Sequence, residues 1–369
     1  MSKKKPPFVL ISAGGTGGHM SPAAALAADL KSRGFRVELA TDTRGQKFAS
    51  MFDGITIHLV KSGTAGRGVI GKVKGVFNLI VGLTQAFILV AKLRPNLVIG
   101  FGGYPSFPAV CVAQKLEIDT ILHEQNAVLG KANVLLAHHA ERIAFSWPQT
   151  TGLEKEDQLR AVITGNPVRA DIEALADVDY DPPVEGGDLK IFVMGGSLGA
   201  TVFSTILPAA LAALPEEQRQ RLKIVQQCRE SDIEDARQIY EDAKINATLA
   251  TFFDDVANQV NVAHLFIGRS GASTVAEMAI AGLPALYVPY PHHKDQQQKR
   301  NADSVAQRGG AWVLAQDEFT IDVVRDKLQS LLQNPQSLSD TAAHAKECGE
   351  RNAARKLGNL VAAIIAAKQ

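Results

Sequence analysis

Two glycine clusters in this chain each follow a short run of β-forming residues. Residues 8–13 (FVLISA) lead into residues 14–19 (GGTGGH), and residues 189–194 (LKIFVM) lead into residues 195–199 (GGSLG). A helix-forming stretch follows each cluster. A glycine-rich turn between strand and helix lets backbone N–H groups and a helix N-terminus approach a phosphate. Two such turns predict two nucleotide-fold domains that serve one phosphorylated ligand.

His19 is the first side chain after a glycine loop that could move a proton. An imidazole beside phosphate-binding amides can act as a base near neutral pH. The alternative is a helix-capping histidine with no chemical role. The loop lacks the dinucleotide spacing G-x-G-x-x-G, but Asp42 follows Gly18 by 24 residues and could bind a ribose. On the loop and Asp42 alone, an NAD-dependent dehydrogenase therefore remains an alternative function.

The composition indicates a soluble globular protein, because 46% of its 369 residues are hydrophobic and 21% are charged. Three separated cysteines, Cys111, Cys228 and Cys348, indicate a reducing compartment without a disulfide framework or a structural zinc site. The basic segment 1–7 precedes an apolar run of only four residues, 8–11. That run is too short for an export signal, so we expect a basic tail before the first strand.

Charge divides the chain into a basic half and an acidic half. Residues 1–165 hold 19 Lys and Arg against 11 Asp and Glu, and residues 166–369 hold 20 against 27. The span 54–115 has no acidic residue, and it contains the most apolar stretch of the chain, residues 76–91. These 16 residues are shorter than the roughly 20 that a membrane-spanning helix needs.

Residues 76–91 are expected to form a crossover helix with one face packed on the sheet. Its other face, rimmed by basic residues, is expected to dock on an anionic membrane surface. A peripheral protein fits this pattern better than an integral one. The expected membrane patch comprises Val69, Ile70, Lys72, Lys74, Val76, Phe77 and Ile80.

Short apolar runs alternate with helical sequence from end to end, which predicts mostly parallel sheets with right-handed crossovers. The acidic segment 176–188, rich in Pro and Gly, is expected to be a loop or linker. The pattern restarts after it, so two doubly wound α/β domains are predicted. Helices are expected from Pro22 to roughly Arg33 and near Ala109–Leu116, and a long terminal helix is expected over residues 342–368. The strands are expected at 8–13, 36–41, 55–60, 96–101, 120–124, 142–146 and 161–165, then at 190–195, 222–227, 247–253, 264–268, 285–290 and 311–315.

A set of motifs in fixed order supports a family assignment for nearly the whole chain, from about residue 8 to about 345. The sequence resembles the MurG family, bacterial enzymes of glycosyltransferase family 28 that add N-acetylglucosamine to the lipid-linked muramyl-pentapeptide precursor of peptidoglycan. Each motif alone is modestly specific, and the ordered set is highly specific. The motifs are GGTGGHMSPAAALA (14–27), GFGGYPSFP (100–108), HEQN (123–126), GNPVR (165–169), GGSLGA (195–200), RSGASTVAE (269–277), GLPALYVPYP (282–291) and HKDQQQKRNA (293–302).

The resemblance implies a GT-B fold, with two Rossmann-like domains and a cleft between them. It implies an acceptor and membrane-facing domain over 1–166, a UDP-GlcNAc domain over 167–345, and a C-terminal helix over 346–369 that packs back on the first domain. The partners implied are UDP-GlcNAc, undecaprenyl-pyrophosphoryl-muramyl-pentapeptide (lipid I), the inner face of the bacterial cell membrane and proteins of cell-wall synthesis and cell division. Nucleic acid, a cofactor and a catalytic metal are not expected.

The resemblance also implies a donor site. Ser197 and Arg169 would hold the UDP phosphates and ribose, the backbone at Phe253 would read uracil, and Glu277 would accept hydrogen bonds from the ribose. Gln297 and Gln298 would bind the hydroxyls of the transferred sugar. For Glu277 the alternative is an ordinary first-turn glutamate favoured by the helix dipole, and for Gln297 and Gln298 it is a glutamine-rich surface helix. The remaining donor contacts implied are Thr16, Gly17, Gly18, Asn126, Ala272, Ser273, Thr274, Val275 and Ala276.

The acceptor would lie against the first domain, and the reaction would invert an α-linked donor to a β-1,4 glycoside. One displacement then needs a base for the acceptor hydroxyl, for which His19 is the first candidate and Glu124 the second. The acceptor contacts implied are Gly14, Gly15, Gly102, Gly103, Tyr104, His123 and Gln125. One departure is Gln226-Gln227-Cys228-Arg229, where many relatives have a His-Gln pair followed by a small residue and glycine. Contacts from that loop are therefore not carried over.

Three other functions are compatible with parts of this pattern. Another GT-B enzyme, such as a diacylglycerol glucosyltransferase or a UDP-GlcNAc epimerase, shares the fold, but the HEQN and GNPVR motifs argue against both. A dehydrogenase would bind NADH and not UDP. A noncatalytic membrane-recruitment or scaffold protein would not need donor-site residues in both domains.

Overall fold

The computed structural model describes residues 6–63, 68–196 and 200–368, with only the backbone of residues 68–72. The chain divides into two units. Unit 1 comprises residues 1–169 and 352–369, and unit 2 comprises residues 170–351. The first division therefore falls three residues beyond the predicted position at 166.

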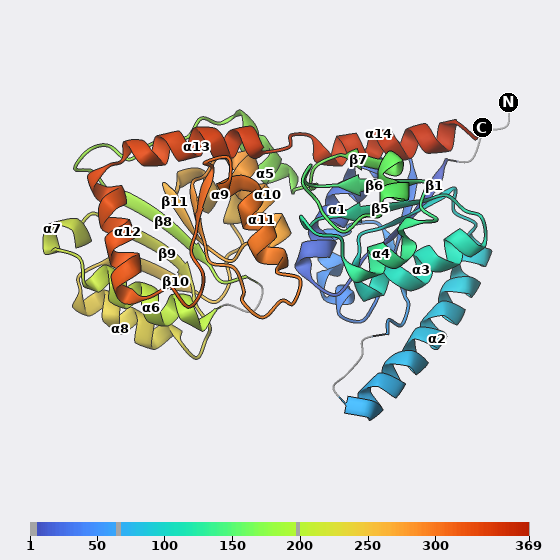
Figure 1. The fold of residues 1–369 in the computed structure, drawn as a ribbon, viewed down its shortest axis with the longest axis horizontal. Helices are drawn as coiled ribbons and strands as arrows, with labels where there is room; N and C mark the ends of the chain where they lie inside the picture. Colours follow the sequence, from blue (N-terminus) through green and yellow to red (C-terminus); the bar gives the residue numbers. More distant parts are fainter. Residues whose placement is uncertain (1–5, 64–67, 197–199, 369) are drawn as a thin grey trace. The chain divides into compact units, whose positions relative to one another are not determined.

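Unit 1 is built on a seven-stranded parallel sheet in the order β3-β2-β1-β4-β5-β6-β7 (Figure 1). Its central strands are buried from end to end, as expected where helices cover both faces of a parallel sheet. The strands are β1 (Phe8–Ser12), β2 (Arg36–Thr41), β3 (Thr56–Leu59), β4 (Leu97–Gly100), β5 (Thr120–Glu124), β6 (Arg142–Phe145) and β7 (Ala161–Ile163). The helices are α1 (Gly17–Ser32), η1 (Gly45–Met51), α2 (Gly68–Leu93), α3 (Gly103–Lys115), α4 (Lys131–Ala137), η2 (Lys155–Arg160) and α14 (Ala353–Ala366).

Unit 2 repeats the plan with six parallel strands in the order β10-β9-β8-β11-β12-β13. The strands are β8 (Leu189–Met194), β9 (Leu222–Gln227), β10 (Asn246–Ala250), β11 (Leu265–Gly268), β12 (Ala285–Tyr287) and β13 (Ala311–Val313). The helices are α5 (Ala170–Glu173), η3 (Ala174–Asp177), α6 (Thr201–Ala212), α7 (Glu216–Arg219), α8 (Ile233–Asp242), α9 (Val256–Val262), α10 (Ala272–Ala281), α11 (Gln297–Ala306), α12 (Ile321–Gln333) and α13 (Gln336–Cys348).

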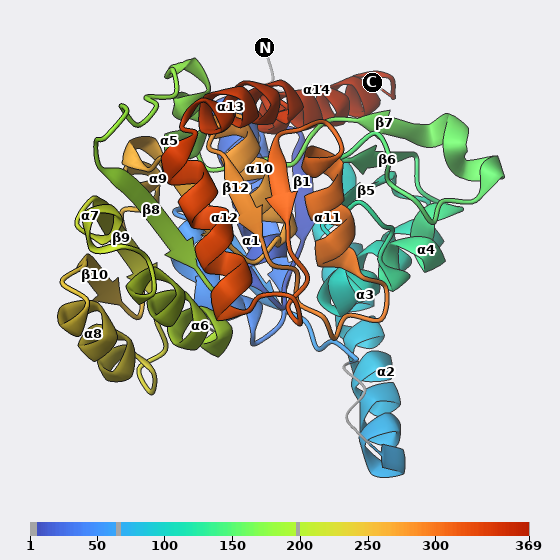
Figure 2. The ribbon, with the colours of Figure 1, turned by 60° about the vertical axis from the view of Figure 1, so that its left-hand side comes forward.

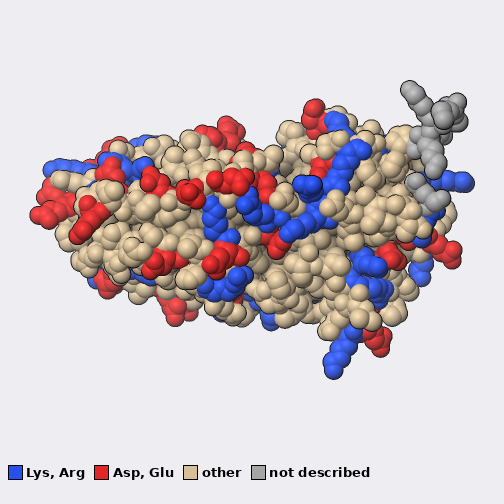
Figure 3. Space-filling view, turned by 90° about the horizontal axis from the view of Figure 1, so that it is seen from above, with Lys and Arg blue, Asp and Glu red and all other residues tan. Residues whose placement is uncertain are grey.

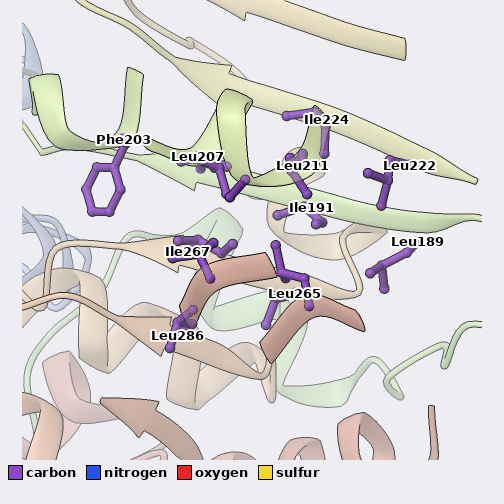
Figure 4. Packing of buried hydrophobic residues seen from close by; sticks show 14 of the residues in the cluster. Leu189, Ile191, Phe203, Leu207, Leu211, Leu222, Ile224, Leu265, Ile267 and Leu286 are labelled. Atoms are coloured by element: carbon purple, nitrogen blue, oxygen red, sulfur yellow. The ribbon is translucent and has the colours of Figure 1, made fainter. Parts of the chain in front are cut away.

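The core of unit 2 lies between its sheet and the helices that cover it. Figure 4 shows Phe203, Leu207 and Leu211 of α6 against strand side chains such as Ile191 and Ile267, all of them buried. Full burial of a large aliphatic side chain stabilises a fold by about 1.5–3 kcal/mol.

The terminal helical sequence forms two helices instead of the one predicted over 342–368. A Cβ on Gly349 would meet the backbone of Ala279 and Ile280 at 2.7–2.9 Å, and Asn352 adopts a positive φ of 59°. The chain therefore turns between α13 and α14. Helix α14 buries Leu357, Val361 and Ile365 in the core that contains α1, which joins the C-terminus to unit 1.

Helix α2 begins before residue 76, the expected start, and has 26 residues. Gly75, Gly82, Ala86 and Val90 are buried, and a Cβ on Gly82 would overlap the Lys61 carbonyl. That stripe packs on unit 1, chiefly on α3. The N-terminal end of α2 extends clear of the rest of unit 1 (Figures 1 and 2).

Candidate active site

The predicted site residues of unit 1 lie at the carboxyl ends of three neighbouring strands of its sheet. The sheet order reverses between β1 and β4, and in doubly wound sheets ligands bind beyond the carboxyl ends of the strands at that point. The first glycine loop follows β1, Gly102 and Gly103 follow β4, and the HEQN segment closes β5. The topology therefore brings together residues that lie about 100 positions apart in the chain.

His19 lies in the first turn of α1, which begins at Gly17 and not near Pro22 as the sequence predicted. Thr16 is the N-cap, and its carbonyl accepts hydrogen bonds from the backbone N–H groups of His19 and Met20. The imidazole Nδ1 lies 2.8 Å from Oε1 of Gln125. The ring is partly exposed. His19 is thus anchored through one ring nitrogen, on the side opposite Nε2.

The other ring nitrogen of His19 faces the loop after β4. A Cβ built on Gly103 would lie 3.3 Å from Nε2 of His19, and one on Gly102 would lie 3.8 Å from Cε1. Both glycines have positive φ, +76° at Gly102 and +71° at Gly103. Glycine is favoured there because a side chain would be strained and would crowd the imidazole. Tyr104, in the first turn of α3, is exposed.

Gln125 connects His19 to a second, fully buried histidine. Its amide nitrogen donates to Nδ1 of His123 at 2.8 Å, and Nε2 of His123 lies 3.0 Å from the carbonyl oxygen of Gly165. Burial lowers the pKa of His123 from its ordinary value to about 4, with a smaller contribution from the charge of His19. His123 is therefore neutral near pH 7. Neither His123 nor Gln125 exposes a side chain to solvent.

Glu124, the second candidate base, is buried and accepts four hydrogen bonds. Oε1 accepts from the backbone N–H and the side-chain amide of Asn126, at 3.1 and 3.0 Å. Oε2 accepts from the Gly130 N–H and the Asn133 amide, both at 2.8 Å. The carboxylate thereby holds the loop between β5 and α4 in place. Asn126, a predicted donor contact, is part of this loop.

Asp42, the candidate ribose-binding residue of a dehydrogenase, forms hydrogen bonds within unit 1 instead. Its carboxylate is buried and accepts hydrogen bonds from the Gly45 N–H at 2.9 Å, Arg44 at 3.0 Å and Ser62 at 3.0 Å. Burial opposes ionisation, but these hydrogen bonds and the Arg44 charge outweigh it, and the pKa of Asp42 is lowered. The Asp42 carboxylate thus binds the first residue of η1, Gly45. It also lies close to the first glycine loop, since a Cβ on Gly14 would lie 3.1 Å from its Oδ1.

Unit 2 presents its candidates at the equivalent edge, where the sheet order reverses between β8 and β11. Ser197, in the loop after β8, lies outside the described residues. Helix α10 begins after β11, and the backbone N–H groups of its first turn suit a phosphate. Ala272, Val275 and Ala276 point into the packed interior, so a ligand could reach only their backbone. Ser273, Thr274 and Glu277 are partly exposed.

Gln297 and Gln298 start α11, which is fixed beside α10. The Ser270 hydroxyl donates to the Gln298 carbonyl at 2.8 Å, and the Asn301 amide donates to the Ser270 carbonyl at 3.2 Å. Oε1 of Gln298 accepts from the Tyr290 N–H, and the Gln297 amide donates to Asp295. The two predicted sugar-binding amides therefore lie next to the predicted phosphate-binding helix start.

Phe253 and Arg169 complete the predicted donor set. The Phe253 ring packs edge to face on Phe192 of β8, with centroids 5.9 Å apart, so its side chain serves packing. Its backbone follows β10 at the same edge of the sheet. Arg169 is the last residue of the first segment of unit 1 and is partly buried.

Two residues of unit 2 act on this edge without having been assigned roles from the sequence. Gln227, the last residue of β9, belongs to the segment that departs from the family pattern; it accepts from the Gly195 N–H at 3.2 Å and donates to the Thr251 carbonyl at 3.1 Å. It therefore joins the second glycine loop to the segment before Phe253. Arg269 donates to the carbonyls of Val288 and Pro289, at 2.9 and 3.1 Å, and holds the chain after β12.

The exposed face of α2 is apolar where a surface helix is usually polar. Val76, Phe77 and Ile80 are 57–62% exposed, and Lys74 beside them is also exposed. The side chains of Val69, Ile70 and Lys72 lie outside the described part. Among the described residues, Val73–Leu93 is long and apolar enough to cross a bilayer by length and composition alone. The 16-residue estimate from the sequence was therefore too short.

The acidic half of the chain corresponds to unit 2. In the face shown in Figure 3, acidic side chains gather on the part that belongs to unit 2.

Within the described residues, no cluster of His, Cys, Asp and Glu could hold a metal ion.

Two doubly wound units, each with candidate ligand contacts at its switch point, define the protein as a two-domain α/β protein of the GT-B class. The chain belongs to glycosyltransferase family 28, because residues 9–145 match the N-terminal domain of that family and residues 190–357 match its C-terminal domain. The predicted fold class and the resemblance to a glycosyltransferase are thereby confirmed.

Two relatives that cover nearly the whole chain share one name. The chain is 48% identical over 353 residues to the UDP-N-acetylglucosamine–N-acetylmuramyl-(pentapeptide) pyrophosphoryl-undecaprenol N-acetylglucosamine transferase of Rhodospirillum centenum, covering 96% of this chain and 93% of that one. A protein with the same name from Paramagnetospirillum magneticum is 44% identical over 366 residues, covering 99% and 98%.

The solved structures agree. The crystal structure of Acinetobacter baumannii MurG matches with a TM-score of 0.78 and 30% identity, covering 97% of this chain and 99% of that one. The calicheamicin glycosyltransferase CalG4 matches with a TM-score of 0.68 at 14% identity, covering 98% of each chain, which is a likeness of fold alone. The predicted membership of the MurG family is confirmed.

Proposed function

We propose that this enzyme transfers N-acetylglucosamine from UDP-GlcNAc to the 4-hydroxyl of the muramyl-pentapeptide of lipid I, forming lipid II for peptidoglycan. The relatives that are 44–48% identical over nearly the full chain are named for these substrates. The observation that carries the chemistry is His19, held through Nδ1 at the ligand-binding edge of unit 1 with Nε2 beside Gly103.

Unit 2 would hold the nucleotide sugar. The start of α10 suits the diphosphate, Glu277 suits the ribose hydroxyls, and the amides of Gln297 and Gln298 suit the sugar hydroxyls without adding charge. Ser197 and Arg169 would complete the phosphate contacts, and the Arg169 guanidinium would stabilise charge on the departing diphosphate. Gln227 would support this site indirectly, through Gly195.

Unit 1 would hold the acceptor against its glycine loops. Gly14, Gly15, Gly102, Gly103 and Tyr104 keep the proposed acceptor role, and Thr16, Gly17, Gly18 and Asn126 keep a proposed contact with the donor. The roles of His123 and Gln125 change, because both side chains are buried and hydrogen-bonded within the unit. They support His19 and do not touch the acceptor.

The reaction is a single displacement at the anomeric carbon. The muramyl O4 forms a bond to C1 of the sugar, the bond from C1 to the β-phosphate oxygen breaks, and UDP leaves with the electron pair. The hydroxyl proton passes to Nε2 of His19. Glu124 is the weaker candidate, because all four of its hydrogen bonds come from N–H donors and protonation of either oxygen would disrupt them.

The enzyme would work as a peripheral protein on the cytoplasmic face of the cell membrane. Gly82, Ala86 and Val90 pack on unit 1, so much of α2 belongs to the folded unit. The exposed apolar face around Phe77 and Ile80 would enter the lipid interface, with Lys74 near anionic headgroups.

Transfer of labelled sugar from UDP-GlcNAc to a lipid I analogue tests the proposal, with diacylglycerol as the competing acceptor. We expect transfer to the lipid I analogue and none to diacylglycerol. Transfer only to diacylglycerol, or interconversion of UDP-GlcNAc without transfer, would overturn the substrate assignment and favour another GT-B activity.

A further inference from the structure

A continuous chain of hydrogen bonds connects the proposed base to a backbone carbonyl. It passes from the Gly165 oxygen to His123, from His123 to Gln125 and from Gln125 to His19, with spacings of 3.0, 2.8 and 2.8 Å. All four residues belong to unit 1. His123 and Gln125 are fully buried, so water does not compete for these bonds.

The direction of each bond in this chain is set by the group that ends it. A backbone carbonyl only accepts, so Nε2 of His123 carries a hydrogen. His123 is neutral because its pKa is about 4, so its Nδ1 has a lone pair and accepts from the Gln125 amide nitrogen. The remaining oxygen of Gln125 only accepts, and Nδ1 of His19 must therefore donate to it.

The Gln125 amide has a second reason to keep this orientation. Its nitrogen also lies 3.2 Å from the carbonyl oxygen of His123, which accepts a hydrogen bond. If the amide were reversed, its oxygen would face that carbonyl and its nitrogen would face Nδ1 of His19. The two bonds donated by the Gln125 nitrogen thus hold its oxygen toward His19.

We propose that His123 and Gln125 are positioning residues that fix His19 in the tautomer with hydrogen on Nδ1, leaving the Nε2 lone pair to take the acceptor proton. The proton transfer from the acceptor rests on the proposed function. The tautomer of His19 does not, because it follows from hydrogen bonds within unit 1. A neutral imidazole otherwise exchanges between two tautomers, and only one of them presents a basic Nε2. The chain removes the inactive tautomer.

Nitrogen NMR of the full chain labelled with ¹⁵N-histidine tests the inference without any substrate. Ring nitrogens with and without hydrogen have distinct ¹⁵N shifts, and the variants His19→Gln and His123→Gln identify the two residues. At pH 8 we expect His19 to have hydrogen on Nδ1 and a bare Nε2, with His123 the reverse. Hydrogen on Nε2 of His19 in the wild-type protein would overturn the inference.

A variant then tests the role of the chain in turnover. Gln125→Met keeps a similar volume and removes both polar groups, so we expect His19 to show both tautomers and kcat to fall by about 10- to 1,000-fold, within the range for general base catalysis. Affinity for UDP-GlcNAc should change less than about threefold, because the proposed donor site lies chiefly in unit 2.

The matched control is Gln114→Met, since Gln114 donates to Thr120 and to the Leu136 carbonyl elsewhere in unit 1. It should alter neither the tautomer of His19 nor kcat. Unchanged tautomer and kcat in Gln125→Met would refute the positioning role. If the wild-type enzyme instead fails to use the lipid I analogue while His19 shows hydrogen on Nδ1, the proposed function fails and the tautomer assignment stands.

Discussion

The neutral, buried state of His123 makes the stability of unit 1 depend on pH. Burial lowers the pKa of His123 to about 4 in the folded protein, whereas an unfolded histidine titrates near 6.5. Between these values the unfolded chain binds more protons than the folded chain. The contribution of His123 is therefore fully present above pH 6.5 and is lost as the pH falls toward 4.

The expected size follows from the two pKa values. A shift from 6.5 to about 4 is 2.5 pH units, and each unit is worth 1.36 kcal/mol, so the full effect is about 3 kcal/mol. Between pH 7.5 and pH 5.0 the loss is about 2 kcal/mol. Other groups that titrate in this range change the free energy of unfolding equally in the wild type and in a variant that lacks only the His123 imidazole. Their contribution therefore cancels in the difference between the two proteins.

The comparison is between the wild type and His123→Gln, each unfolded in urea at pH 7.5 and at pH 5.0. The substitution Trp312→Phe in both proteins leaves Trp147, buried in unit 1, as the fluorescent probe. We expect His123→Gln to be less stable at pH 7.5 and the difference to shrink by about 2 kcal/mol at pH 5.0. An equal difference at both pH values would refute the claim that His123 is buried and neutral.

Three further predictions concern the loop, the glycines and the helix surface. Glu124→Gln should destabilise unit 1 by about 2–4 kcal/mol in the same assay, because an amide nitrogen would face N–H donors; full stability with lost transfer would instead make Glu124 catalytic. Gly103→Ala should lower kcat at least about tenfold at unchanged donor affinity, because the alanine Cβ would lie 3.3 Å from Nε2 of His19. A normal kcat would show that the backbone at residue 103 moves to accommodate the methyl group. Phe77→Ser with Ile80→Ser should weaken binding to anionic vesicles in sedimentation while transfer to a soluble acceptor stays normal; unchanged vesicle binding would exclude this face.

The sequence predicted the strands well because parallel strands covered on both faces are continuous apolar runs. It was less accurate at helix starts. Helix α3 begins at Gly103, six residues before the expected position, because Pro105 lies in the first helical turn, where its missing N–H costs nothing. Helix α1 likewise takes in the last glycines of its loop, and this places His19 on the helix.

The site was only partly predictable. Motif order was enough to mark His19 and the HEQN segment, but sequence spacing does not show which way a side chain points. The contact between His19 and Gln125 spans 106 positions and depends on the parallel sheet that puts β1 and β5 at one edge. The four bonds to Glu124 and the bond from Gly195 to Gln227 likewise depend on loop conformation. Burial, which separates positioning residues from contact residues, became visible only in the fold.

Single-turnover transfer by His19→Ala tests the central claim, that His19 is the base, most directly. The measurement follows labelled N-acetylglucosamine from UDP-GlcNAc to a lipid I analogue, with UDP-GlcNAc affinity determined separately and His139→Ala as a surface histidine control. We predict a rate at least about 100-fold below wild type, with donor affinity unchanged and the control fully active. A His19→Ala enzyme that turns over at a near-normal rate would contradict the account.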